Sequence, residues 1–392
     1  AALSDTALPS STRRIRLTPS TETLCPQVAN QGFGYPCAYT TAPPAAVAQT
    51  TSAVVFAHSF RMPSVQRATL SLEHSSRRFY LSAGYVMSIA TQLPQSVDLN
   101  IAPSHSSATF VLQGGDGHSG LYTGQGFTIP LYTARRTTAF GPITALVSNA
   151  NATYHAFTAD ARLHTRDALQ LRLTYTFSRA IDYGPQLSAS PRRDGQFDPF
   201  ANGYDKGLSS LNVPHRLSSE LVLRSSLRHG PELLRRGGSG FRLSAIGILS
   251  SGAPYSYEIF GGSYLSGGRD TINGSGGATY LPTLGRNTLR LPVRSKLDLR
   301  AGREISLREH LRLNAFAEAF NLLNTRSFSR VETRAFLVGT PAFSGAATPL
   351  VFQDTAAVAI EGVGTPAFGS PTSSTSGASR ERQMQLGLRL EF

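Results

Sequence analysis

The chain has 392 residues, 40% of them hydrophobic, and contains 36 glycines and 23 prolines. It has no run of about 18 apolar residues, so the sequence excludes a transmembrane helix. The many glycine, proline, serine and threonine residues indicate frequent turns. This composition is compatible with a β-barrel, in which hydrophobic residues alternate with polar ones along each strand.

The formal net charge of +13 raises the question of nucleic-acid binding. Only Lys206 and Lys296 are lysines, so nearly all of the 37 basic residues are arginines. The arginines are scattered through strand-like segments, often opposite a face of leucines, and do not gather on one helix or tail. A positively charged barrel lumen or a lipopolysaccharide-facing surface explains this distribution at least as well as nucleic acid does, and nucleic acid stays a minor alternative.

The first 50 residues are rich in Ser, Thr, Pro and Ala and show no sustained period, so we expect residues 1–53 to form an irregular extracellular extension. Cys25 and Cys37 lie in it as a candidate local disulfide in an oxidising compartment; the alternative is two buried thiols. The chain begins at Ala1 without a basic-then-apolar leader. Either a leader has been removed or the chain is the later part of a longer polypeptide, and we favour the second.

Alternation of apolar and polar residues begins near residue 54. Successive side chains of a strand point to opposite sides, so this period indicates β-strands with one apolar face. In residues 169–177, for example, Leu171 and Leu173 share one face and Gln170 and Arg172 the other. Strands are predicted at residues 65–74, 79–88, 96–101, 108–112, 140–147, 152–163, 169–177, 215–227, 241–250, 293–305, 310–323 and 383–392.

Two segments are ambiguous. Residues 89–139 include a glycine-rich stretch, 114–126, in which no strand register can be assigned. Residues 310–323 contain three alanines around Glu318 and suit a helix by propensity. Their alternation also suits a strand, which we prefer because of the position of this segment among the loops.

Loop length alternates along the second half of the chain. The links at residues 164–167, 229–239 and 306–309 are short, whereas residues 180–214, 251–292 and 324–379 form long links. Outer-membrane barrels have short periplasmic turns and longer extracellular loops, while a soluble β-sandwich has no physical reason for this alternation. We therefore predict an antiparallel transmembrane β-barrel with a periplasmic C-terminus and long extracellular loops over residues 54–392.

The closing segment, residues 383–392, has the roughly 9–11 residues that a membrane-spanning strand needs. Its apolar face ends on an aromatic C-terminal residue, which is similar to the assembly signal of bacterial outer-membrane barrels. The alternative is an amphipathic edge strand of a soluble sheet. The residues of this face are Met384, Leu386, Leu388, Leu390 and Phe392.

Catalytic and metal-binding patterns are absent from the sequence. The nine histidines are dispersed, the two cysteines have no histidines nearby, and no phosphate-binding loop or nucleophile elbow occurs. We therefore expect neither an enzyme nor a cofactor. The glycine-rich residues 261–277 include Asp270 and Asn273, but without a repeated ligand pattern they indicate a flexible outer loop and not a calcium site.

Seven short motifs follow one another along the chain. They are Phe-Gly-Pro-Ile-Thr at 140–144, Asn-Ala-Thr-Tyr-His-Ala at 151–156, Leu-Thr-Tyr-Thr-Phe-Ser-Arg-Ala-Ile-Asp at 173–182, Val-Pro-His-Arg at 213–216, Ser-Ser-Gly-Ala-Pro-Tyr at 250–255, Gly-Arg-Asn at 285–287 and Ala-Glu-Ala-Phe-Asn-Leu-Leu-Asn at 317–324. Taken in this order, they resemble the C-terminal barrel of TonB-dependent outer-membrane receptors, and most of all the Oar-like group.

The resemblance implies an outer-membrane barrel of about 22 strands, with a plug domain in its lumen and energy delivered by TonB through the plug. This chain has no recognisable plug and only about a dozen predicted strands. We therefore expect the later section of a receptor that takes up a siderophore, glycan or peptide. The expected partners are membrane lipid and lipopolysaccharide, the barrel-assembly machinery, the upstream barrel half with its plug, and an unidentified small ligand.

Two other functions stay open at this point: a soluble or surface-displayed all-β binding module, and an arginine-rich nucleic-acid binder. In the receptor hypothesis, aromatic residues of the long loops are the expected place of ligand capture, although solvent-exposed loop filler explains them as well. These residues are Tyr255, Tyr257, Tyr264 and Tyr280.

Overall fold

The computed structural model describes residues 51–117, 120–165, 168–184, 195–225, 232, 238–262, 271–308, 311–342, 345–354, 357–360, 363–374 and 381–392. Apart from one short 3-10 helix, η2 (Asn202–Asp205), the named elements in these ranges are all β-strands. Within the same ranges no helix has both the length and the apolar character needed to cross a membrane.

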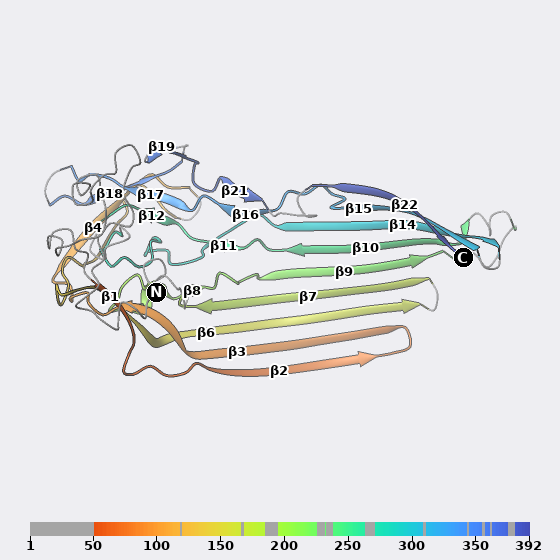
Figure 1. The fold of residues 1–392 in the computed structure, drawn as a ribbon, viewed down its shortest axis with the longest axis horizontal. Coiled ribbons are helices and arrows are strands. Elements are labelled where there is room, and N and C mark those ends of the chain that lie inside the picture. Colours follow the sequence, from red (N-terminus) through yellow and green to blue (C-terminus); the bar gives the residue numbers. More distant parts are fainter. Residues whose placement is uncertain are drawn as a thin grey trace, which may run out of the picture.

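Long antiparallel strands form one continuous sheet, called the wall (Figure 1). Each strand pairs with the next wall strand along the chain, because each connection is a hairpin or a loop that returns to the same edge. In sheet order the wall strands are β2 (Ser64–Ser75), β3 (Phe79–Asp98), β6 (Phe140–Thr165), β7 (Leu169–Asp182), β9 (His215–Arg224), β10 (Phe241–Ser250), β14 (Arg294–Arg308), β15 (Leu311–Phe320) and β22 (Gln383–Glu391).

The two faces of the wall differ in polarity, as the alternation predicts. One row of directly paired side chains is apolar, and the adjacent row, displaced by one residue on every strand, is polar. The apolar row consists of Leu72, Ala83, Ala159, Tyr175 and Leu217. The polar row consists of Glu73, Ser82, Asp160, Thr174 and Ser218. Among the residues that the structure describes, no layer covers the apolar face, and Leu72 and Leu386 are 78% and 87% exposed.

The connections separate by length at the two ends of the wall (Figure 1). The links β2–β3, β6–β7, β9–β10 and β14–β15 lie at one end, together with the C-terminus. The long connections β3–β6, β7–β9, β10–β14 and β15–β22 lie at the opposite end. The predicted alternation of short and long links thus extends over the whole wall.

The long connections fold together into a compact unit, called the head. A five-stranded sheet in the order β12-β17-β18-β4-β5 organises it. The pairs β12–β17 and β18–β4 are parallel and join strands from different connections. The strands of this sheet are β4 (Ser106–Gln113), β5 (Gly126–Leu131), β12 (Glu258–Phe260), β17 (Arg334–Val338) and β18 (Thr348–Phe352).

Short pairs complete the structure. They are β8 (Gly207–Leu208) beside β7, β11 (Pro254–Tyr255) with β13 (Leu289–Arg290), β16 (Phe328–Val331) with β21 (Pro371–Ser374), and β19 (Ala357–Ile360) with β20 (Val363–Thr365). In addition, β1 (Thr51–Phe56) runs parallel to the start of β6. This strand crosses the predicted boundary between residues 53 and 54.

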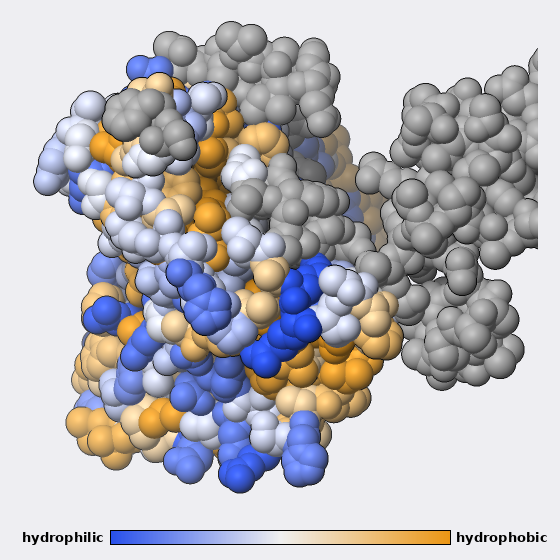
Figure 2. Space-filling view, turned by 90° about the vertical axis from the view of Figure 1, so that its left-hand side faces the viewer, coloured by the Kyte–Doolittle hydropathy of each residue, from blue (hydrophilic) through white to orange (hydrophobic). Residues whose placement is uncertain are grey.

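The hydrophobic core of the described residues lies in the head and not in the wall. Its largest fully buried members include Phe197, Tyr257 and Phe336, each with 0% exposure. All four long connections contribute to it, because Phe110, Phe197, Tyr257 and Phe336 come from successive ones. Seen from this end, the surface of the molecule mixes hydrophilic residues with hydrophobic patches (Figure 2).

The structure corrects two expectations about strands and loops. Residues 140–147 and 152–163 belong to one strand, β6, and residues 79–88 and 96–98 both belong to β3, which ends at Asp98 and not at residue 101. Both strands continue because a bulge near Gln92 (φ 59°) absorbs the irregularity in their pairing, so no turn interrupts them. The long links also contain strands of their own, and two pairs of these strands, β12–β17 and β18–β4, join different connections within the head.

Residues 311–320 form the predicted strand, β15, despite their helix propensity. The segment pairs with β14 on one side and with β22 on the other. These two ladders satisfy its backbone groups and override the preference of alanine for helix. The last strand, β22, pairs with β15 in the described residues, and its polar face carries Gly387 beneath the ring of Phe316.

Candidate functional site between wall and head

A polar cavity of about 290 Å³ lies where the head meets the wall. Its lining combines residues of four chain segments that are far apart in sequence. The ones used below are Gln95 at the end of β3, Gln196, Asp205, Glu258, Tyr280 and Arg286. Such a recess between two structural units, with convergent polar groups, is a common location for ligand sites.

Arg286 reaches this cavity because of the turn that holds it. The flanking residues Gly285 and Asn287 have φ values of +74° and +59°, which glycine and asparagine tolerate better than other residues. The guanidinium group is buried, with 8% exposure. Its Nε donates to the backbone oxygen of Asp205 (2.7 Å), and Nη2 donates to the backbone oxygen (3.1 Å) and the carboxylate of Asp182. Arg286 therefore ties the end of β7 to the head.

Asp205 is the buried carboxyl group of the site. It accepts hydrogen bonds from the hydroxyl of Tyr280 (2.5 Å) and from the backbone N–H of Phe197 (3.1 Å). Burial raises the pKa of Asp205 to about 6, because desolvation outweighs the hydrogen bonds and the nearby charge of Arg286. The same burial and the neighbouring carboxylate raise the pKa of the Tyr280 hydroxyl. Tyr280 therefore acts as a hydrogen-bond donor at neutral pH.

Two further contacts fix the cavity walls. The side-chain amide of Gln196 donates to Oε1 of Gln95 (2.6 Å), and Gln95 in turn donates to the backbone oxygen of Tyr183 (2.9 Å). On the head side, Oε2 of Glu258 accepts from the hydroxyl of Thr333 (2.9 Å). The cavity thus offers carboxylate, amide and guanidinium groups already held in place, which suits hydrogen bonding to a polar ligand.

The described residues contain no cluster of three or more His, Cys, Asp or Glu side chains that could hold a metal ion. The cavity groups themselves are carboxylates, amides, a guanidinium and a tyrosine that donates to a carboxylate. This set can bind and orient a molecule. It offers no paired nucleophile and base of the kind that covalent catalysis requires.

The tyrosines predicted to capture a ligand occupy different places. Tyr257 is fully buried, stacks on Phe368 (5.1 Å between centroids) and donates to the carboxylate of Asp116, so it is a core residue and not an exposed contact. Tyr280 is 5% exposed and belongs to the same core, although it also lines the cavity. Tyr255 is half-buried beside Phe368. The alternative of solvent-exposed loop filler is therefore wrong for Tyr257 and Tyr280, because the head buries them, and their part in ligand capture stays a prediction.

Tyr264 and the cysteines Cys25 and Cys37 lie outside the described residues. The apolar residues of the closing strand lie on the apolar face of the wall, where Met384, Leu388 and Phe392 are 74%, 77% and 100% exposed. Asp205, Gln95, Gln196 and Arg286 were not predicted as site residues. The only signal for them was the Gly-Arg-Asn motif at 285–287.

The apolar outer face, the polar inner face and the antiparallel order define a membrane β-barrel wall. Residues 5–278 and 273–385 match the family of the outer membrane beta barrel domain. The chain belongs to this family, and its place is the bacterial outer membrane. The apolar face of the wall is therefore the lipid-facing side, and the polar face lines the lumen.

Among solved structures, the chain is similar to the outer membrane transporter YddB from Escherichia coli, with 12% identity over 88% of this chain and 34% of that one and a TM-score of 0.42. It is also similar to the FrpB iron transporter from Neisseria meningitidis (F3-3 variant), with 10% identity over 86% of this chain and 32% of that one and a TM-score of 0.37. The chain spans about a third of the length of each. No curated protein sequence matches it.

Proposed function

We propose that this chain is the C-terminal barrel section of a TonB-dependent outer-membrane receptor and takes part in the uptake of a scarce siderophore, glycan or peptide. The observation that carries the proposal is the head itself. Four long connections from one end of a barrel wall fold into one unit with a polar cavity at its base. A rigid, pre-formed site of this kind lowers the entropic cost of capturing a ligand.

The orientation follows from the same features. Long loops of outer-membrane barrels face the outside and short turns face the periplasm. We therefore place the head outside the cell and the C-terminus in the periplasm. The sheet begins at β2 and ends at β22, and no pairing joins these two strands in the described residues. The proposed partners are accordingly an upstream barrel section with its plug and, through the plug, TonB. The motifs that resemble the Oar-like group support this assignment.

Ligand capture can be tested on outer membranes that contain the chain. Three labelled probes represent the candidate classes: a ferric siderophore, a maltooligosaccharide and a tripeptide. We expect one class to be retained and its retention to fall in Glu258→Gln, which removes a charge from the cavity but keeps an acceptor for Thr333. Arg216→Gln, on the wall away from the cavity, is the matched control. Retention of none of the three, or equal retention by both variants, would contradict the proposed capture site.

Energy coupling needs a separate measurement. The retained probe is followed into cells that contain the chain together with its upstream section, with and without TonB. We expect uptake only where TonB is present. Probe entry at the same rate in cells without TonB would exclude a TonB-dependent receptor, while leaving capture by the head intact.

A further inference from the structure

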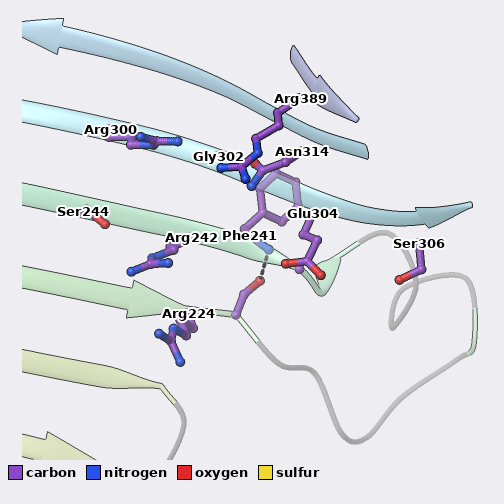
Figure 3. A pocket seen from close by; sticks show the side chains of 12 residues that line it. Arg224, Phe241, Arg242, Ser244, Arg300, Gly302, Glu304, Ser306, Asn314 and Arg389 are labelled. Atoms are coloured by element: carbon purple, nitrogen blue, oxygen red, sulfur yellow. Dashed lines mark hydrogen bonds between the residues drawn. The ribbon is translucent and has the colours of Figure 1, made fainter. Parts of the chain in front are cut away.

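Each face of the wall carries a hollow. On the lumen face, a cavity of about 1010 Å³ is lined mainly by polar and charged side chains, among them Arg224, Arg242 and Glu304 (Figure 3). In the receptor proposed above, the plug covers this face. On the opposite side, a groove of about 470 Å³ lies over β2, β3, β6, β7 and β9. A plug in the lumen cannot cover that side, so the groove meets membrane lipid.

Two neighbouring rows of paired residues form this hollow, called the lipid-side groove. In one row Ala83 pairs with Ala159, and in the next Leu81 pairs with Ala161. The alanines form the floor of the groove because their side chains are short, and longer side chains flank them on both sides. The flanking residues are Leu72 and His74 on β2, Leu81 on β3, Leu173 and Tyr175 on β7, and Leu217 on β9.

The lining of the groove is apolar over its floor. Ser82 and Asp160 border the groove, but their side chains belong to the polar row on the lumen side. The hydroxyl of Tyr175 is hydrogen-bonded to Nδ1 of His215 (2.8 Å), which leaves the ring for contact with the groove. His74 lines the end of the groove close to the β2–β3 turn. The groove therefore offers a hydrocarbon surface, which suits an acyl chain better than a polar ligand.

Packing favours an acyl chain in the groove over one elsewhere on this face. Lipid tails are as apolar as leucine side chains, so association within the membrane depends on packing contacts. An unfilled groove forfeits the dispersion contacts of the atoms that line it. An acyl chain in the groove contacts the floor and both flanks, whereas a chain on a flat part of the face contacts protein on one side only. The groove should therefore hold a chain more tightly than the surface around it.

The position of the groove along the wall indicates which lipid supplies the chain. Leu72, His74 and Leu81 lie close to the β2–β3 turn, and this turn carries Arg77 and Arg78, which are both exposed. Arginines at a membrane surface attract the anionic headgroups of lipids. In the orientation proposed above, this end of the wall lies in the periplasmic leaflet. The lipid there is phospholipid, because lipopolysaccharide occupies the outer leaflet.

We propose that the lipid-side groove holds one acyl chain of a phospholipid of the periplasmic leaflet, with the headgroup of that lipid at Arg77 and Arg78. The bound chain completes the outer surface of the wall where the alanines leave it hollow. The site lies on the outside of the wall and so goes beyond the capture of a ligand at the head. Only the choice of leaflet rests on the proposed orientation.

The test is to extract the full chain from outer membranes in a mild detergent and to identify the lipids that stay bound by mass spectrometry. We expect a phospholipid to stay with the unchanged chain. Ala159→Leu with Ala161→Leu fills the floor and should retain about tenfold less of it, which corresponds to about 1.4 kcal/mol. Ala315→Leu with Ala317→Leu is the matched control. It makes the same change on the lipid-facing side of β15, where these alanines pair with Leu388 and Leu386, and should retain as much phospholipid as the unchanged chain.

Two further variants separate the chain from the headgroup. Leu72→Ala with Leu217→Ala lowers the flanks and should lose the phospholipid as the filled variant does. Arg77→Gln with Arg78→Gln leaves the groove intact and should reduce retention by a smaller factor.

Equal retention by the filled variant and its control would overturn the proposal, as would an unchanged chain that emerges free of phospholipid. Retention of lipopolysaccharide in place of phospholipid would overturn it too, while leaving ligand capture by the head untouched. Crosslinked dimers of the unchanged chain that disappear in the filled variant would also overturn it and assign the groove to a second copy of the chain.

Discussion

The wall and the head of this protein differ in where their apolar side chains lie. The wall directs its apolar side chains outward, and Leu386 and Leu388 are 87% and 77% exposed. The head buries its apolar side chains, and Phe336 and Leu350 are fully inaccessible. The wall therefore depends on lipid to cover its apolar face, whereas the head contains a core of its own. The outer surface of the wall is therefore expected to face membrane lipid, and the outer surface of the head is expected to face water.

This difference determines what each region tolerates. In the wall, backbone ladders fix the strands, because an unpaired peptide group in lipid costs several kcal/mol. A polar substitution is then costly on the lipid side and mild on the lumen side. In the head, side-chain packing between four connections fixes the structure, and loss of volume is the costly change.

Phe336→Ala tests the head and has the largest expected effect. The ring is fully buried and lies edge-on to Phe352, with 5.3 Å between the centroids. Its removal leaves a cavity and should lower the free energy of unfolding of the head by about 3–5 kcal/mol. Limited proteolysis of the chain in outer membranes should show faster cleavage of the head with an unchanged wall. Tyr122→Ala, at a residue that is 65% exposed, should leave cleavage unaltered; equal cleavage of both variants would show that the head has no independent core.

Leu388→Arg tests the wall in the same way. If Leu388 faces lipid near the middle of the membrane, arginine there should cost about 2–4 kcal/mol. The lumen-side substitution Gln385→Arg should be tolerated, because Gln385 already contacts the carboxylate of Glu318. Urea unfolding of the chain in lipid vesicles measures both. Equal losses would show that the assignment of the two faces is wrong.

Gly387→Ala tests how tightly side chains pack on the lumen side of the wall. A Cβ at this position would lie 2.3 Å from the ring of Phe316. The ring would have to move away from β22, which should lower the free energy of unfolding by about 1–3 kcal/mol. The same urea measurement should show this loss in the native background and little of it in a Phe316→Ala background. An equal loss in both backgrounds would exclude the ring as its cause.

The pH dependence of the head is the smallest expected effect. The folded-state pKa of Asp205 is about 6, above its ordinary value of 3.8, so the folded head holds a proton there more tightly than the unfolded chain. The contribution of this group is therefore greatest below pH 3.8 and decreases as the pH rises to about 6. Thermal unfolding of the head between pH 4 and pH 7 should show this decrease, and Asp205→Asn should flatten it. An unchanged slope in the variant would assign the dependence to other groups.

The wall could be predicted closely from the sequence. The bounds of β10, residues 241–250, agree with the prediction, and the apolar face of β22 is the predicted one. The reason is physical: neighbouring strands are also neighbours in sequence, and membrane on one side imposes a strict period of two. The bulge at Gln92 escaped prediction although Pro94, which cannot donate a hydrogen bond to the ladder, lies within the same irregular pairing of β3 with β6.

The head could not be predicted, since its contacts join distant segments. The partner of β12 is β17, more than seventy residues further along the chain, and the two strands are parallel. The burial of Tyr257 and Tyr280 could not be predicted, because glycine- and serine-rich segments usually form loops. Asp205 gives no sequence signal, since the groups that surround it include Tyr280 and Arg286, which lie more than seventy residues further along the chain.

The most direct test of the central claim is fractionation of cells that express this chain behind a secretion leader, beside a copy that ends before Phe392. If the chain is a wall of an outer-membrane barrel with an aromatic assembly signal, the intact chain should be recovered in the outer membrane with its wall protected from protease. The shortened copy should be largely lost from that fraction. Recovery of both copies in the aqueous phase of the periplasm would contradict the account.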